Sequence, residues 1–260
     1  APTLYYYCHY HSGMGGQANT NSTFGSSNFS GSVQTKVSTN TTSGLSIVSY
    51  SGNATSGATI GHGLASVPQW VMVKSRTNGA DWWGMYLSAL GNNKSIFLND
   101  TSAEGTRTYW NQTNPTSSVF SVSNERSVNG SGETFIAYCF SEKKGYSKFG
   151  SYTGNGNSDG PMIVTGFKPA LVIIKRTDNS SGANWLLLDS VRSDINVVNE
   201  NLFANLTDAE TSTGRCDFVS NGFKLRQSGT TVNTSSGTYI YIAFAESPFV
   251  NSNGVPNNAR

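Results

Sequence analysis

The sequence S-Y-S-G-N at residues 49–53 returns as S-Y-T-G-N at 151–155, and this repetition determines the fold that the sequence predicts. Three later landmarks recur in the same order: proline-led runs at 68–74 and 169–175, V-N pairs at 128–129 and 232–233, and closing runs at 134–142 and 238–246. Each second copy lies 101 to 104 residues beyond the first. A shift that stays this constant over a whole unit indicates a tandem duplication.

Both copies consist of short strand-like runs separated by Gly, Asn and Ser turns. The run at 46–50 is typical of a half-buried strand, and Pro68 opens the next one. No convincing helical stretch interrupts these runs. The pattern predicts an all-β fold with two tandem β-sandwich repeats of jelly-roll or lectin-like type, preceded by a short strand and a polar linker.

The composition sets the predicted domain boundaries. Residues rich in Ser, Thr, Asn and Gly separate an aromatic N-terminal run from the first repeat, as a linker does. The predicted parts are a terminal strand and loop of an N-terminal module at 1–16, a linker at 17–45, the first repeat at 46–145, the second repeat at 146–249, and a polar tail at 250–260.

Charge and composition exclude several classes of protein. Of the 260 residues 36% are hydrophobic and only 12% are charged, with a net charge of +2, so neutral polar side chains must cover the surface. Nucleic-acid binding needs a clustered basic stripe, which the sequence lacks. No apolar run reaches the ~18–20 residues of a membrane span. With three cysteines a disulfide framework is not expected, and Cys139, on the closing run of the first repeat, is predicted to be a small buried hydrophobic residue.

The N-terminal run offers the one pattern suited to a metal. Cys8, His11 and Met14 form a C-x2-H-x2-M spacing that resembles the copper loop of cupredoxins, where thiolate, imidazole and thioether bind copper together with a second histidine. In that family the second histidine comes from an earlier strand, and here only His9 and His62 remain as candidates for it. We therefore interpret the run as the end of a cupredoxin-like module and expect neither metal nor cofactor, with Cys8, His11 and Met14 as the metal-ligand candidates.

The carboxylates and histidines do not form a catalytic pattern. Glu104 recurs as Glu210, and Glu142 recurs as Glu246. A residue that returns in both copies favours a role in folding, and Glu142 and Glu246 are expected to pair with lysine or backbone donors at the closing strands. His62 is the one histidine within the repeats and no G-x-S-x-G motif is present, so the sequence predicts a protein that is not an enzyme.

Aromatic side chains are the candidates for a binding site. Trp82 recurs as Trp185, and this pair is predicted to lie in the two cores. Trp83, Tyr109 and Trp110 occur in the first copy alone. Because sugars stack their C–H faces on exposed rings, these three residues are the predicted glycan-binding residues.

Several motifs add a family resemblance. The stretch at 61–76, T-F-I-A-Y-C-F-S-E at 134–142 and G-Y-S-K-F-G-S-Y-T-G-N-G at 145–156 resemble virion proteins of marine tailed bacteriophages. The run at 5–16 is also similar to module ends in the fibre and structural proteins of such phages. The resemblance implies a location at the virion surface, outside cells, and other virion subunits as partners in a homotrimer. No catalytic or binding residue carries over.

The leading hypothesis is a non-enzymatic tail-fibre or spike-type adhesin. It would contact host-surface polysaccharide without cleaving it, with no cofactor, no nucleic acid and no membrane insertion. One alternative is a capsid-decorating or fibre-shaft structural protein with no ligand. Another is a secreted glycan-active enzyme, against which the missing carboxylate signature argues.

Overall fold

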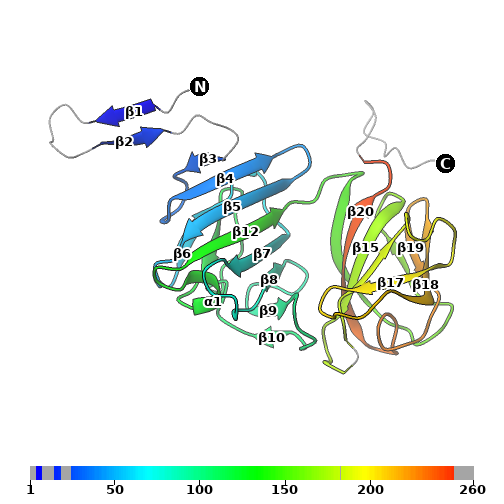
Figure 1. Ribbon diagram of the computed structural model, residues 1–260. Coiled ribbons are helices and arrows are strands. Elements are labelled where there is room, and N and C mark those ends of the chain that lie inside the picture. Colours follow the sequence, from blue (N-terminus) through cyan, green and yellow to red (C-terminus); the bar gives the residue numbers. More distant parts are fainter. Residues whose placement is uncertain (1–3, 8–14, 19–24, 182, 249–260) are drawn as a thin grey trace. The chain divides into compact units, whose positions relative to one another are not determined.

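The chain is built almost entirely of strands, as Figure 1 shows. A computed structural model describes residues 4–7, 15–18, 25–181 and 183–248, the first two ranges by their backbone alone. Within these residues the one helix is α1 (Arg126–Asn129), a single turn. The all-β prediction is therefore confirmed. No helix of the described chain is long and apolar enough to cross a membrane.

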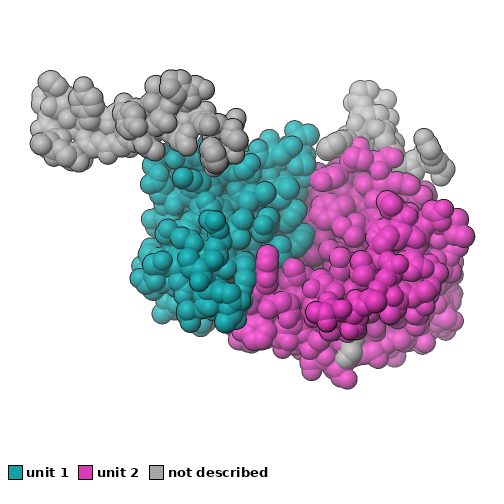
Figure 2. Space-filling model, in the orientation of Figure 1, with its two compact units in different colours: residues 1–81, 108–141 teal, residues 82–107, 142–260 magenta. Residues whose placement is uncertain are grey.

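The chain divides into two compact units, coloured separately in Figure 2. One comprises the described residues up to Asp81 together with 108–141, and the other comprises 82–107 together with the described residues from Glu142 onward. The segment 82–107 lies inside the first repeat in sequence but belongs to the second unit. The repeat boundaries predicted from the sequence did not anticipate that 82–107 belongs to the second unit.

The first unit holds antiparallel sheets. Its larger sheet runs in order through β7 (Trp70–Ser75), β12 (Thr134–Phe140), β5 (Leu45–Ser51), β4 (Thr35–Asn40) and β3 (Ser26–Asn28). A smaller sheet pairs β6 (Ala58–Gly61) with β11 (Val119–Val122), and a hairpin pairs β1 (Leu4–Tyr7) with β2 (Gly15–Ala18). Burial alternates along β12, so that Phe135, Ala137 and Cys139 enter the core. The prediction that Cys139 is buried is confirmed, and its thiol is free.

The second unit holds one large sheet that curls into a nearly closed barrel. It runs in order through β13 (Ser147–Thr153), β20 (Thr238–Ala245), β15 (Pro169–Arg176), β16 (Leu186–Asp189), β17 (Val198–Phe203), β18 (Thr211–Val219), β19 (Gly222–Leu225) and β14 (Met162–Val164). The segment 82–107 supplies β8 (Gly84–Leu87), β9 (Lys94–Phe97) and β10 (Gly105–Thr106), which follow β7 in the strand order of the larger sheet described above and are not strands of the barrel. Apolar side chains such as Ile174, Leu188 and Phe223 fill the interior.

The landmarks shared by the two copies meet in space and form one hydrogen-bonded junction. In the first copy the Tyr50 hydroxyl donates to the carbonyl oxygen of Val128 at 2.6 Å. The Asn53 backbone N–H donates to Oδ1 of Asn129 at 3.0 Å, and Nδ2 of Asn129 donates to the carbonyls of Thr55 and Ser123. Asn129 is fully buried, and these three bonds satisfy the donors and the acceptor of its amide.

The second copy builds the same junction from its own landmarks. The Tyr152 hydroxyl donates to the carbonyl of Val232 at 2.7 Å, and the Asn155 N–H donates to Oδ1 of Asn233 at 2.8 Å. The glycine before each turn is also required. A Cβ on Gly154 would lie 2.2 Å from the carbonyl oxygen of Thr234, and a Cβ on Gly52 would meet a carbonyl at 2.3 Å. The repeated S-Y-x-G-N and V-N motifs are therefore the two halves of one junction.

The segment 82–107 is joined to the second unit by buried polar contacts. The indole Nε1 of Trp185 donates to the carbonyl of Phe97 at 2.7 Å. Nζ of Lys175, which is fully buried, donates to the carbonyls of Thr101 at 3.0 Å and Ser102 at 3.2 Å. Burial lowers the pKa of Lys175 to about 8. These contacts explain why the segment belongs to the second unit.

The two predicted core tryptophans have different outcomes. Trp185 is fully buried, as predicted. Trp82 is 42% exposed, so its assignment to a core was wrong. Its ring lies against Phe97 in the same unit, with centroids 5.1 Å apart, and leaves part of the indole open to solvent.

The junction predicts which amides stabilise the protein. Asn129→Ala and Asn233→Ala should each lower the free energy of unfolding by about 2–4 kcal/mol, because each substitution removes three hydrogen bonds of a fully buried amide, each worth about 1 kcal/mol. Urea unfolding followed by tryptophan fluorescence measures the change. Asn124→Ala, at an exposed position, is the control and should change the stability little. A small effect at both buried sites would contradict the role of the junction.

Candidate functional site

The structure does not bring the predicted glycan-binding aromatics together as an exposed platform. Tyr109 is 6% exposed and Trp110 is 2% exposed, and both lie in the first unit. Trp83 belongs to the second unit and is half-buried, with its backbone N–H bonded to Oδ1 of Asn99 at 3.0 Å. A ring inside a core offers no face to a sugar, so Tyr109 and Trp110 are core residues and not binding residues. Tyr109 and Trp110 occur in the first copy alone because they fill a core that is specific to that copy.

The predicted metal ligands cannot be placed. Cys8, His11 and Met14 lie outside the described residues. In the part of the chain that the structure describes, no three His, Cys, Asp or Glu side chains gather as a metal site would require. The two other cysteines, Cys139 and Cys216, are both buried, and burial raises the pKa of their thiols.

The recurrent glutamates hold ion pairs, as the sequence predicted for the closing strands. Glu142 pairs with Lys148 at 2.9 Å and accepts the backbone N–H of Phe149 at 2.8 Å. Glu246 pairs with Lys168 at 3.0 Å. Glu104 and Glu210 also pair, at 3.7 Å with Lys94 and at 2.6 Å with Arg192. These carboxylates connect neighbouring strands and loops of the second unit.

The carboxyl groups of Asp81 and Glu133 influence each other's pKa. Burial, together with the negative charge of Glu133, raises the pKa of Asp81. Arg126, whose Nε lies 2.7 Å from the Glu133 carboxylate, lowers the pKa of Glu133. The second Glu133 oxygen accepts the Ser75 hydroxyl at 2.9 Å. Because both oxygens of Glu133 already have partners, the pair is an element of the loop structure.

His62 is a structural histidine. It is fully buried, with Nε2 3.1 Å from the carbonyl oxygen of Thr116 and Nδ1 accepting the Leu64 N–H at 3.2 Å. Burial lowers its pKa. Both ring nitrogens are therefore occupied by backbone groups, one in the turn that follows β6 and one before β11.

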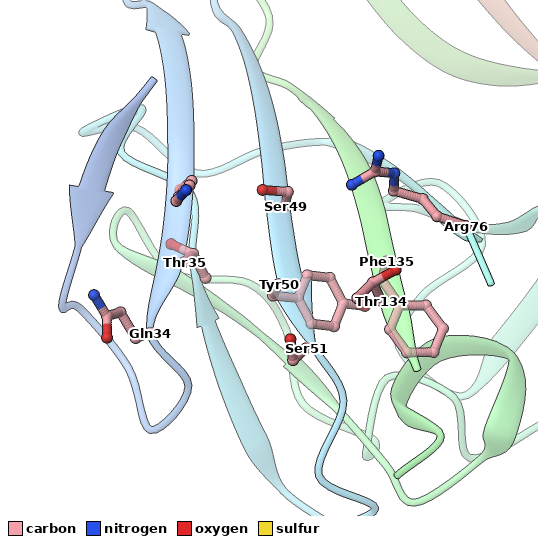
Figure 3. A pocket seen from close by; sticks show the side chains of 9 residues that line it. Gln34, Thr35, Ser49, Tyr50, Ser51, Arg76, Thr134 and Phe135 are labelled. Atoms are coloured by element: carbon pink, nitrogen blue, oxygen red, sulfur yellow. The ribbon is translucent and has the colours of Figure 1, made fainter. Parts of the chain in front are cut away.

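The feature best suited to a ligand is a groove of about 350 Å³ in the first unit, which Figure 3 shows from close by. Its floor is the outward face of β5 and the start of β12, and its flanks come from β4 and from the residue after β7. The lining side chains that point outward are Gln34, Lys36, Ser49, Ser51, Arg76 and Thr134. No acidic residue lines it.

Strand register explains how distant residues meet in this groove. Lys36 on β4 lies opposite Ser49 on β5, and Ser51 lies opposite Thr134 on β12. The backbone N–H of Arg76 donates to the carbonyl of Thr134 at 2.7 Å, which extends this second row to the end of β7. Alternate residues of a strand share a face, so both rows of side chains point to the same side of the sheet. Tyr50 and Phe135 alternate with them and point into the core, where their rings stack with centroids 5.2 Å apart.

The polar side chains of the groove have no partner within the described residues. No hydrogen bond or ion pair joins the Arg76 guanidinium, the Lys36 ammonium or the Ser49 hydroxyl to any described group. The other described arginines, in contrast, bind a carboxylate, an amide or a ring. The groove therefore gathers two cations and several hydroxyls that form no bond with another described side chain.

The sequence contains a signal for this groove that motif reading missed. Polar residues occupy alternate positions at 34–36 and 49–51, which marks an outward face. Only the pairing of strands 100 residues apart shows that these positions join Arg76 and Thr134. Exposed polar alternation is common in strands, so the pattern alone does not identify a site.

An antiparallel sheet with a polar groove, joined to a second unit of the same repeated design, defines the class: an all-β tandem-repeat protein. Residues 18–248 match the model of a family described as Domain of unknown function (DUF7483), and the chain belongs to that family. The match spans both repeats, so the duplicated pair is the unit of the family. No curated protein and no solved structure matches the chain in the comparisons.

The buried His62 predicts an acid-sensitive stability. The folded protein keeps the imidazole neutral, whereas the unfolded chain binds a proton below the ordinary pKa of about 6.5. The contribution of His62 is therefore fully present above pH 6.5 and is lost as the pH falls below it. Urea unfolding at pH 7.5 and pH 5.5 should show lower stability at the acid value. His62→Gln, which does not titrate, should show a smaller loss, and an equal loss in both proteins would contradict the assignment.

Proposed function

We propose that the protein is a non-enzymatic virion-surface adhesin of the tail-fibre or spike type, which contacts host-surface glycan through the groove of the first unit. The observation that carries this proposal is the groove itself: outward hydroxyl, amide and cationic side chains without partners, on a rigid sheet. Sugar hydroxyls need such donors and acceptors. The motifs at 61–76 and 134–156 that resemble phage virion proteins support the location, and imply a homotrimer with other virion subunits as partners.

The distribution of carboxylates supports binding without cleavage. Glycosidases hold two carboxyl groups about 5–9.5 Å apart on either side of the bond. No carboxylate lines the groove, and the recurrent glutamates are held in ion pairs. A secreted glycan-active enzyme, the third hypothesis, therefore gains no support from the groove.

A structural role without a ligand is the second candidate, and one observation favours it. The loop between β16 and β17 carries Val191 and Ile195, which are 88% and 76% exposed. Two such open apolar side chains on one loop favour a contact with another protein that would cover them. A capsid-decorating or fibre-shaft protein would use such residues against other virion subunits.

Binding to an array of bacterial polysaccharides tests the proposal. The wild-type protein should bind at least one polysaccharide saturably and leave its length unchanged. Ser49→Ala/Ser51→Ala/Thr134→Ala should weaken that binding about tenfold or more, because it removes three groove hydroxyls that would each contribute about 0.5–1.5 kcal/mol. Ser117→Ala/Ser131→Ala/Ser228→Ala, at exposed positions elsewhere, is the matched control and should bind like the wild type. Binding to no polysaccharide would favour the structural role, and shortening of a bound glycan would favour the enzyme.

A further inference from the structure

We infer that the groove binds acidic saccharides, with Arg76 and Lys36 recognising carboxylate groups of a uronic-acid chain. This inference rests on the proposed glycan-binding function and specifies its ligand. Arg76 and Lys36 are the cations of the groove, and both side chains are exposed. Charge-assisted hydrogen bonds to a carboxylate are the strongest that such side chains form, and the guanidinium can make two in parallel.

The absence of a stacking surface in the groove argues for an acidic ligand. Neutral sugars are commonly held by an aromatic face. The two aromatic residues that line the groove are Tyr50 and Phe135, which are 4% and 0% exposed, and their rings stack on each other inside the core. Recognition must therefore come from hydrogen bonds and charge, and the charge in the groove is positive.

The position of the cations suits a chain of sugars. Lys36 and Arg76 are separated by β5 and β12, and three strand spacings of about 4.8 Å put their backbones about 14 Å apart across the sheet. Figure 3 shows the Arg76 side chain reaching back over the sheet, above Thr134. The hydroxyls of Ser49, Ser51 and Thr134 lie between the two cations in the strand order. The carboxylates of a short acidic oligosaccharide would meet the cations at the two flanks, and its neutral hydroxyls would meet the serine and threonine hydroxyls between them.

A bare anion would use only part of this groove. Inorganic phosphate or sulfate would bind the cations but leave the hydroxyls and the Gln34 amide without a ligand partner. A carboxylated sugar engages both kinds of group at once. An acidic peptide offers carboxylates but few hydroxyls, so the hydroxyl floor favours a saccharide.

The cations of the groove are also free of competition from acidic side chains. The nearest carboxylate in sequence is Glu133, beside Thr134, and its oxygens are bound to Arg126 at 2.7 Å and Ser75 at 2.9 Å. The other cation on β7, Lys74, lies opposite Ile136 of β12, and its Nζ already donates to the Gly79 carbonyl at 3.2 Å. Arg76 and Lys36 therefore remain available for a ligand.

The test is titration of the full chain with polygalacturonate, alginate and hyaluronate, each beside its carboxyl-esterified form, which keeps the sugar and removes the charge. At least one acidic form should bind ten times more tightly than its ester. Arg76→Gln should weaken binding of that acidic form at least tenfold, Lys36→Gln should weaken it severalfold, and Arg76→Lys should retain part of the affinity. Lys144→Gln, which removes an exposed cation from the second unit, should bind like the wild type. Thermal unfolding of each variant checks that the fold is kept.

Several results would overturn the inference, and they differ from a failure of the proposed function. Equal binding of acid and ester, or equal loss in Lys144→Gln and Arg76→Gln, would show that the charges of the groove do not select the ligand while leaving a glycan adhesin intact. Equal binding of polyaspartate would show that a polyanion suffices without a sugar. Binding of no polysaccharide, acidic or neutral, would remove both the inference and the adhesin.

Discussion

A buried asparagine amide holds each repeat together. Asn129 and Asn233 each connect a turn that follows the first strand of the repeat to the segment that precedes its closing strand, 74 to 78 residues away in the chain. A side-chain amide has both donors and an acceptor, so one residue in the later segment makes several bonds to the turn at once. Tyrosine hydroxyl bonds to Val128 and Val232 join the same two segments. Because the junction joins the ends of the repeat, the sheet between them can vary.

The two copies use that freedom differently. In the second copy β17, β18 and β19 continue the sheet to β14, and the sheet becomes nearly a barrel. In the first copy β8, β9 and β10 follow β7 in the strand order, and 82–107 is also hydrogen-bonded within the second unit through the Phe97 carbonyl and the buried Lys175. Tyr109 and Trp110 then enter the interior of the first unit as the chain returns. A family model that spans 18–248 is consistent with two copies that fold as one evolutionary unit.

The membership of 82–107 in the second unit illustrates what could and could not be predicted from the sequence. The strands, the repeat, the burial of Cys139 and the ion pairs of Glu142 and Glu246 follow from patterns that are local or that repeat at a fixed shift. The exposure of an aromatic residue does not, because it depends on which distant segment covers it. The structure places Trp83, not Trp82, at the position of Trp185, because the backbone N–H of each donates to an asparagine Oδ1, of Asn99 and of Asn205. Yet Trp83 is half-buried and Trp185 is fully buried. The groove could not be predicted for the same reason. Its lining residues come from positions 34 to 134 and become neighbours only when β4, β5 and β12 pair in register.

The two cations of the groove are distinctive because the protein carries few charged residues. In a protein with abundant lysine and glutamate, two unpaired cations on a sheet would be ordinary surface residues. Here only 12% of residues are charged, and most of the described acidic and basic side chains form ion pairs within one unit. Such pairs cancel each other at a distance, so the field around the protein is weak and any recognition of an anion must be short-ranged. A short-ranged contact selects by geometry, and the groove has two neighbouring rows with hydroxyls, one flanked by Lys36 and the other by Arg76.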